Sequence, residues 1–410
     1  MDLMCHEKRS ASLVTLPDDL VFMEILVRLP VKYLVRCKCV STYWRARIED
    51  GDFVREHRDR SSSSRPSLLI IPRNVGEGDR EEFDDDISFY ILGPGQEPDT
   101  FEDKAELMCE KACPPELVEG ITNFIYPTHC DGLVAIATGT DQVFLCNPAT
   151  QEFVALPLGT PDVDIDNMRP PSAAIGFDLS QKQYVIARYF YRRRCFDEST
   201  GKLDYDIGHE VFTLGDNSWS WKPTVDPPHA IGHTRPVCTG DVIYWGCDHM
   251  EDPLPSSLMR FSLQYKTFDL VPCPPGFAYN SAIEHLADLN GKLCYVNLTT
   301  SENTFDVWQL ADDGTLWLPR CRIDPDDCLD SVAFGSVAFL PLLTAGGRML
   351  TMVSDDEQRL YWCDERSGDV EEVVDLEEDI DLEGWDDSDY CIHHIVPYRE
   401  SLISITNCRV

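Results

Sequence analysis

Residues 162–167 form the first segment of the chain whose side-chain types could bind a cation. Asp162, Asp164 and Asp166 alternate there, as in the first half of a calcium-binding loop. The glycine that such a loop requires at its sixth position is missing, and Ala173 stands where its bidentate glutamate belongs. We therefore interpret the segment as a solvated loop.

A second group of potential metal ligands consists of Cys109, Cys113, His129 and Cys130. Their spacing is looser than in zinc fingers or zinc ribbons. A chain with 17 cysteines in 410 residues is expected to contain such a group by chance. The sequence therefore predicts no metal site and no other cofactor.

Carboxylates are dense at Glu81–Asp86 and Asp375–Asp389. Paired carboxylates can serve as acid and base in glycoside hydrolysis. Both runs are uniformly polar, with no apolar wall that would raise the pKa of one carboxylate above that of another. The sequence also contains no phosphate-binding loop, nucleophile elbow or zinc-protease helix motif. We predict no catalytic residues, and keep a glycosidase-like hydrolase as the alternative.

The one basic and aromatic stretch runs from Arg188 to Arg194. If it is a strand, Arg188, Phe190, Arg192 and Arg194 share one face because side chains alternate along a strand. Two interpretations are open. The stretch is either a strand neutralised by acidic neighbours or a docking site for an acidic partner.

The charge distribution divides the chain into two parts. The net charge is −37, and it excludes a nucleic-acid partner because phosphate binding needs a basic face. Residues 1–60 carry +1 and the remaining 350 residues carry −38, which indicates two domains. The first residues contain no apolar signal segment, and no apolar run is long enough to span a bilayer. The many unpaired cysteines fit a reducing compartment, the cytosol or nucleus.

Residues 16–57 show signals for three or four short helices. Pro17 suits a first helical turn, Pro30 ends a helix, and Ser41 is a good N-cap. A unit of forty residues buries too little apolar area to be firmly stable alone, so some of its apolar side chains should meet a partner.

The order of residues from Leu16 to about His57 closely resembles the F-box. This resemblance implies binding to a Skp-type adaptor, which links F-box proteins to a cullin ubiquitin ligase. The positions that match the apolar positions of the family, and that are implied to bind the adaptor, are Leu16, Pro17, Leu20, Ile25, Leu29, Pro30, Leu34, Val40 and Trp44.

After a polar break at Ser61–Ser64, the chain consists of short runs rich in Val, Ile, Phe, Tyr and Trp, bounded by turn residues. The glycines that mark this pattern lie 44–64 residues apart, at positions 132, 176, 240, 291 and 347. Such spacing favours a β-propeller, of about six blades, with a closing strand near Leu402–Ile405. The expected fold is mainly β with a small α domain: a flexible segment 1–15, an F-box 16–60, a linker 61–66 and a kelch-like propeller 67–410.

Several segments of the second part resemble the F-box-associated interaction domain of plant F-box proteins. They are His129–Val134, Cys146–Thr150, Ile175–Asp178 and Asn217–Trp219. Together with the F-box, this resemblance implies a subunit that captures a protein substrate for ubiquitination by a Skp–cullin–F-box ligase. A scaffold that binds the adaptor without degradation is a further alternative.

The acidic residues of the second part suggest how a substrate would be chosen. We expect them to surround one rim of the propeller and to steer a basic partner. The residues expected to carry this effect are Glu377, Glu378, Asp379 and Asp381. A solvating role for the same residues is the alternative.

Overall fold

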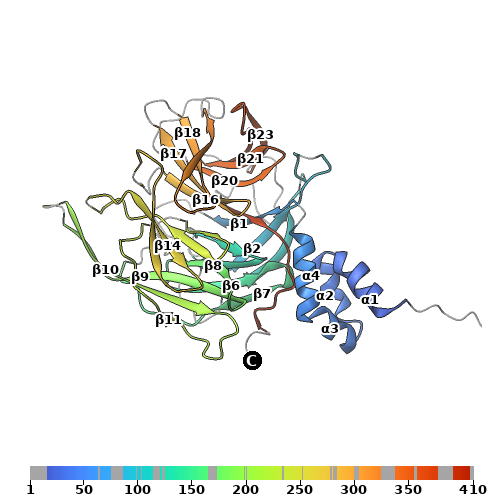
Figure 1. Cartoon of the computed structure of the whole chain (residues 1–410). Helices are drawn as coiled ribbons and strands as arrows, with labels where there is room; N and C mark the ends of the chain where they lie inside the picture. Colours follow the sequence, from blue (N-terminus) through green and yellow to red (C-terminus); the bar gives the residue numbers. More distant parts are fainter. Residues whose placement is uncertain are drawn as a thin grey trace, which may run out of the picture.

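A computed structural model gives the arrangement of most of the chain (Figure 1). It describes residues 16–62, 65–74, 86–97, 99–102, 104–113, 121, 125–164, 173–197, 199, 201–232, 235–251, 253–277, 279, 284–299, 304–324, 338–354, 358–376 and 391–406. The expected flexible segment 1–15 lies outside these residues. No helix within them is long and apolar enough to cross a membrane.

The N-terminal part is a small helical domain. Ser41 caps α3 as predicted, because its hydroxyl accepts the N–H of Trp44 at 3.1 Å. Asp50 caps α4, because its carboxylate accepts the N–H of Asp52 at 3.0 Å. The elements are α1 (Asp18–Leu20), the π-turn η1 (Val21–Ile25), the 3₁₀ turn η2 (Leu26–Arg28), α2 (Val31–Cys37), α3 (Thr42–Ile48) and α4 (Gly51–Ser61).

The core of the helical domain is apolar and centres on Phe22. Its ring contacts three other rings edge-on, with centroid distances of 6.1 Å to Tyr43, 5.5 Å to Trp44 and 6.4 Å to Phe53. The other buried members are Leu26, Val27, Val31, Leu34, Ile48 and Leu402. The last of these comes from the far end of the chain.

The rest of the described chain forms six four-stranded antiparallel sheets, the blades of a six-bladed propeller, as predicted. The first complete blade along the chain consists of β4 (Thr128–Cys130), β5 (Leu133–Ala137), β6 (Val143–Asn147) and β7 (Glu152–Ala155). The next consists of β8 (Ala173–Asp178), β9 (Gln183–Asp197), β10 (Lys202–Thr213) and β11 (Lys222–Pro223). It is followed by the blade of β12 (Val237–Thr239), β13 (Val242–Trp245), β14 (Ser257–Ser262) and β15 (Phe268–Pro272).

Two further blades follow along the chain, and the last one is built from both ends of the domain. They are β16 (Glu284–Leu289), β17 (Lys292–Thr299), β18 (Thr304–Leu310) and β19 (Trp317–Ile323); β20 (Ala338–Ala345), β21 (Arg348–Ser354), β22 (Gln358–Asp364) and β23 (Val370–Asp375); and β24 (Cys391–Tyr398) with β1 (Ser67–Asn74), β2 (Asp86–Leu92) and β3 (Glu106–Ala112).

The ring is closed by β24, which pairs with β1 from Ser67↔Tyr398 to Asn74↔Cys391. The prediction of a closing strand at Leu402–Ile405 is therefore wrong. That run is apolar for another reason, since Leu402 lies in the helical core and Ile405 between two blades.

The predicted turns are confirmed at most of the marking glycines. Asn290 and Gly291 both have positive φ, as do Gly346 and Gly347, which suits two-residue hairpin turns. Gly176 is different, because it lies inside β8. A Cβ atom there would come within 2.5 Å of Cys238 Sγ on the neighbouring blade, so this glycine permits close packing of two blades.

The helical domain rests on the propeller at the face where the inner strands end. Arg58 of α4 pairs with Asp131, which follows β4, at 3.3 Å, and stacks over Phe177 of β8. The N–H of Val31 donates to the Glu400 carboxylate, just after β24, at 3.0 Å. In Figure 1, α2 and α4 lie on the side of the helical domain that faces the propeller, and α1 and α3 lie farther from it.

The tail after β24, residues 399–406, joins the two domains. Leu402, only 3% exposed, packs into the helical core. On the other side, the amide of Asn147 donates to the carbonyls of Ser401 and Ile403, at 3.1 and 2.7 Å. The Glu152 carboxylate accepts the N–H of Ile405 at 3.0 Å. The tail therefore fixes the position of the helical domain on the blade β4–β7.

Candidate functional site

The helical domain exposes large apolar side chains that its own core leaves uncovered. Leu16 is 56% exposed and Val40 is 63% exposed. We call the exposed set the apolar surface of the helical domain; it consists of Leu16, Leu20, Ile25, Tyr33, Val40 and Tyr43. Such a concentration of apolar side chains in a unit this small indicates a protein-binding surface.

The apolar surface is held in place by the core beneath it and by polar contacts at its edge. Tyr43 packs on Phe22 and donates its hydroxyl to Asp18 at 2.7 Å. This hydrogen bond to an acceptor raises the pKa of the Tyr43 hydroxyl, as does the charge of Asp18. Arg47 also stacks on Phe22, with its guanidinium 5.2 Å from the ring centroid. Helices α1 and α3 are thereby kept together.

The predicted adaptor-binding residues fall into three groups. Leu16, Leu20, Ile25 and Val40 belong to the apolar surface, and Pro17 and Pro30 are also exposed. Leu29 and Trp44 are half-buried.

Leu34 is 0% exposed and lies in the helical core. Its assignment to the contact surface is corrected, since a residue enclosed by its own domain supports that surface without touching a partner. Sequence matching could not separate the two roles, because the apolar positions of a helical motif include both core and surface residues.

Tyr33 and Tyr43 were missed by sequence matching, although both are about half exposed. Tyr33 stands beside Lys32 and Arg36, whose charged groups lie 5.8 and 5.9 Å from its ring centroid.

The basic stretch on β9 does not form a docking surface at Arg188 and Phe190. Arg188 is 2% exposed, and it donates to Glu210 at 2.8 Å and to Asp141 at 2.5 Å. Phe190 is buried as well. The alternative interpretation, a blade strand neutralised by acidic neighbours, fits these two residues.

Further along β9, a bulge breaks the regular alternation. The register with β10 shifts between Tyr191 and Arg193, so Arg192 has no direct partner. Arg194 then reaches Asp248 of the next blade at 2.6 Å, whereas Arg188 reaches Asp141 of the preceding blade. The expectation that the four residues share one face is wrong for this reason. Arg192 is half exposed, and it pairs with Asp206 and Asp226.

The acidic residues expected to choose a substrate lie outside the described residues. This holds for Glu377, Glu378, Asp379 and Asp381. At the start of the same run, Asp375 pairs with Arg359 at 2.9 Å. The steering of a basic partner stays a prediction.

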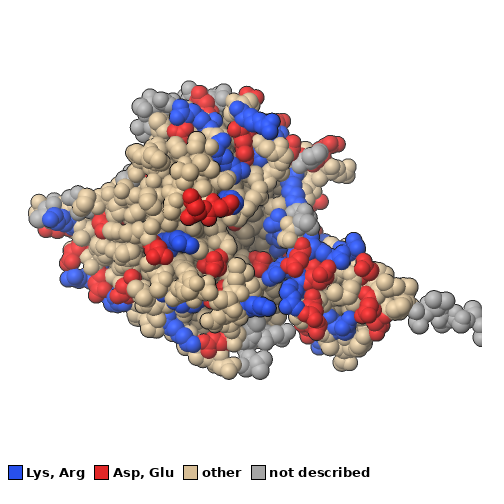
Figure 2. Space-filling view, in the orientation of Figure 1, with Lys and Arg blue, Asp and Glu red and all other residues tan. Residues whose placement is uncertain are grey.

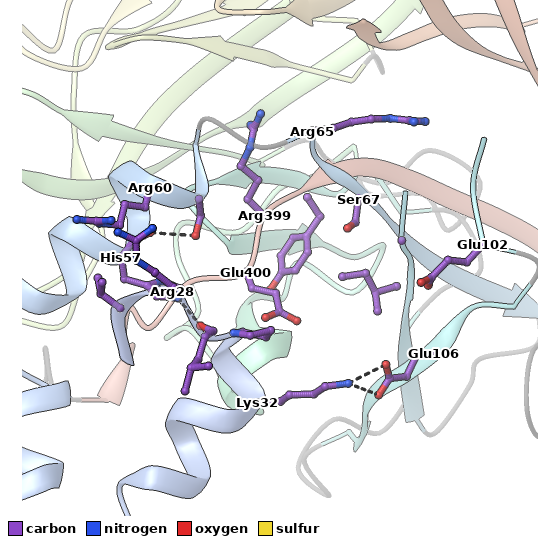
Figure 3. A pocket seen from close by; sticks show the side chains of 17 residues that line it. Arg28, Lys32, His57, Arg60, Arg65, Ser67, Glu102, Glu106, Arg399 and Glu400 are labelled. Carbon is purple, nitrogen blue, oxygen red and sulfur yellow. Dashed lines mark hydrogen bonds and ion pairs between the residues drawn. The ribbon is translucent and has the colours of Figure 1, made fainter. Parts of the chain in front are cut away.

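A cavity of about 660 Å³ lies between the helical domain and the propeller (Figure 3). Lys32 crosses it to Glu106 at 2.9 Å, and this hydrogen bond raises the pKa of Lys32. Burial raises the pKa of Glu400, which accepts the Val31 N–H at its wall. Burial also lowers the pKa of His57, whose ring nitrogen lies 3.0 Å from the Leu29 carbonyl. Lys32–Glu106 and Val31–Glu400 are the contacts of this cavity that connect the helical domain to the propeller.

Figure 2 shows Lys, Arg, Asp and Glu side chains gathered where the helical domain meets the propeller. In the described part of the chain, no group of three His, Cys, Asp or Glu side chains is placed to hold a metal ion. The described features that stand out are the apolar surface of the helical domain and the close attachment of this domain to the propeller.

Known families match both parts of the chain. The profile of the F-box domain matches residues 13–56, and the profile of the F-box associated beta propeller domain matches residues 96–330, more than half of the chain.

Individual relatives agree with these profiles. The Arabidopsis thaliana protein At5g15660, named as an F-box protein, is 29% identical over 314 residues, which cover 73% of this chain and 62% of that protein. The Arabidopsis thaliana F-box/LRR-repeat/kelch-repeat protein At1g09650 is 25% identical, with 98% of this chain and 100% of that protein covered. A solved oligogalacturonate lyase in complex with manganese aligns with 76% of this chain and 82% of its own, at 10% identity and a TM-score of 0.43, too low to bear on function. The chain belongs to the F-box proteins that carry an F-box associated beta propeller domain.

Proposed function

We propose that this protein is a substrate receptor of a Skp–cullin–F-box ubiquitin ligase. The F-box binds the Skp-type adaptor through its apolar surface, and the propeller captures a protein substrate. No bond is made or broken by this chain. It acts by holding the substrate near a ubiquitin-charged partner, which raises the effective concentration of the reacting groups.

The observation that carries the proposal is the exposed set of large apolar side chains on an F-box that is otherwise well packed. Leu16, Leu20, Ile25 and Val40 are exposed, while the core beneath them is complete. Buried apolar area is the dominant favourable contribution to most protein association. A surface of this kind needs a partner of matching shape, and the family membership supports an adaptor in that role.

The attachment of the F-box supports the same proposal. Arg58, Glu400 and Leu402 fix the helical domain on one face of the propeller. A receptor that presents its substrate in a constant direction gains from such a fixed junction, because productive transfer depends on orientation.

Co-purification of the tagged full chain with a Skp-type adaptor and cullin tests the proposal. The double variant Leu16→Asp with Val40→Asp should lose the adaptor, because two charges would be placed on the apolar surface. Leu158→Asp is the matched control, since Leu158 is an equally exposed leucine on the propeller. Adaptor binding that is the same in all three proteins would contradict the proposal.

The same experiment separates a receptor from a non-degradative scaffold. For a receptor, blocking the proteasome should increase the amount of captured protein and of its ubiquitin conjugates, in the wild type only. If the adaptor binds and neither amount changes, the scaffold is the correct alternative.

A further inference from the structure

The six inner strands surround a channel along the axis of the propeller. A cavity of about 90 Å³ lies in this channel, lined by residues 127–129, 235–238, 286–288, 340–342 and 396–397. It continues into a larger cavity, of about 470 Å³, below α4, and the two share His129, Cys238, Asp288 and Pro397. The smaller cavity has room for several water molecules, and therefore for one carboxylate or phosphate group.

The two ends of the channel carry different charged groups. Where the inner strands end, near the F-box, acids and bases are mixed: Asp131 and Asp288 line the cavity together with Arg58 and Arg399. Where the strands begin, on the face away from the F-box, stand Arg235 before β12 and His285 at the start of β16. A cationic end is unusual in a domain whose net charge is −38.

Arg235 has no carboxylate partner among the residues that the structure describes. Its one hydrogen bond goes to the Ile395 carbonyl, at a long 3.3 Å. Burial lowers the pKa of Arg235, and only Tyr126 acts in the opposite direction. Arg188, by contrast, is paired with both Glu210 and Asp141. Arg235 is partly buried, with the rest of its side chain exposed. A guanidinium that has lost part of its hydration and has no described counter-charge favours the binding of an anion.

Two histidines beside Arg235 are suited to the same anion. Burial, together with Arg399 and Arg235, lowers the pKa of His129 to about 4, and burial with Arg235 does the same for His285. Both rings are therefore neutral at pH 7, and each carries one N–H donor. His129 lines the cavity itself.

We propose that the end of the channel at Arg235 binds an anionic oxygen group, a carboxylate or a phosphate, with Arg235 as its charge partner and His129 as a further donor. The guanidinium has several N–H donors in a planar arrangement that matches both groups. Arg235 precedes β12 and so lies toward the end of the channel away from the F-box. The proposed site stands whether or not the chain serves a ligase.

Binding of defined anions to the full chain tests this site. Inorganic phosphate and acetate represent a free anion, and fluorescein-labelled decaglutamate represents an acidic protein segment. Decalysine serves as the charge control, because the acidic surface would bind it without help from Arg235. We expect phosphate or acetate, compared with chloride at equal ionic strength, to raise the melting temperature of the wild type.

The variants are Arg235→Gln, which removes the charge, and Arg235→Lys, which keeps it if the glutamine variant folds poorly. Arg193→Gln is the control, since Arg193 is an exposed arginine that pairs with Asp204. Affinity for the anion should fall at least about tenfold in Arg235→Gln and less in Arg235→Lys, and stay the same in Arg193→Gln.

The outcomes distinguish the sources of the anion. Loss of both free-anion and decaglutamate binding in Arg235→Gln assigns the site to an acidic segment of a protein, and loss of free-anion binding alone assigns it to a small anion. The proposal is overturned if no anion binds the wild type, or if Arg235→Gln and Arg235→Lys bind as tightly as the wild type. Adaptor binding, measured on the same samples, shows separately whether the proposed receptor function holds.

Discussion

At the scale of single residues, the ion pairs of the propeller differ in burial and therefore in their contribution to stability. Some lie inside the propeller and are enclosed and paired, such as Arg188 with Glu210. Those on its surface, such as Arg193 with Asp204, are more than half exposed and contribute little. In the sequence, Arg188 and Arg193 belong to one basic stretch. The strand bulge and the neighbouring blades make Arg188 buried and Arg193 exposed.

Removal of one partner from the buried pair should be costly. Glu210→Ala leaves the Arg188 guanidinium inside the propeller with Asp141 as its only carboxylate partner among the described residues. We expect a loss of about 3–5 kcal/mol in the free energy of unfolding, measured by denaturant titration. Asp204→Ala, the matched change at the exposed pair, should cost less than about 1 kcal/mol. Equal losses in the two variants would show that Arg188 is not enclosed as described.

His209 should make stability depend on pH. The side chain is buried against Phe261 and Phe268, and burial lowers its pKa to about 3 from an ordinary value near 6.5. The unfolded chain therefore binds the proton first, and the contribution of His209 is present above pH 6.5 and is lost as the pH falls toward 3. Each pH unit in this window costs up to about 1.4 kcal/mol.

Comparison with His209→Phe isolates this contribution, because the carboxylates titrate in both proteins. Relative to the variant, the wild type should lose unfolding free energy as the pH falls from 6.5 to 4, as measured by urea titration at each pH. Parallel curves for the two proteins would rule out a neutral buried His209.

At the scale of elements, three of the four segments that resemble the F-box-associated domain reach the junction with the F-box. Asp131 of His129–Val134 pairs with Arg58, and Asn147 of Cys146–Thr150 holds the tail. The blade pattern and the helices could be predicted, because alternating apolar residues, turn glycines and caps are local signals. The position of Leu402–Ile405 could not be predicted, because it depends on contacts with segments far away in the sequence. Leu402 packs in the helical core, and Ile405 packs between the blades β4–β7 and β8–β11.

The tail should govern the stability of the F-box. Leu402→Ala removes a side chain from the helical core, and we expect about 2–5 kcal/mol less stability for that domain. Limited proteolysis should then cut the helical domain earlier than in the wild type, while the propeller stays resistant. Leu179→Ala, at an exposed leucine of the propeller, is the control. Identical cleavage of all three proteins would mean that the tail does not complete the F-box core.

At the scale of the whole molecule, the apolar surface lies on the F-box, and the F-box is attached to one face of the propeller. The long hairpin of β9 and β10 also projects on the side opposite the F-box (Figure 1). Family, fold and blade number could be predicted from the sequence. The substrate could not, because the acidic residues 377–381 lie outside the described chain and the Arg235 site depends on strands far apart in the sequence.

The propeller should fold without the F-box. A protein of residues 65–410 should show strand-type circular dichroism, since all six blades lie within it. It should also be less soluble, because Leu402 loses its helical cover. A soluble but mainly helical product would contradict the described fold.

The affinity of the purified full chain for a Skp-type adaptor, measured by isothermal titration calorimetry, tests the central claim most directly. We predict that Leu20→Asp with Ile25→Asp weakens binding at least about a hundredfold, as expected when two interface anchors are lost. Circular dichroism should remain that of the wild type, because both leucine and isoleucine are exposed. Tight adaptor binding by this variant, or no adaptor binding by the wild type, would contradict the claim that the apolar surface of the F-box recruits the ligase.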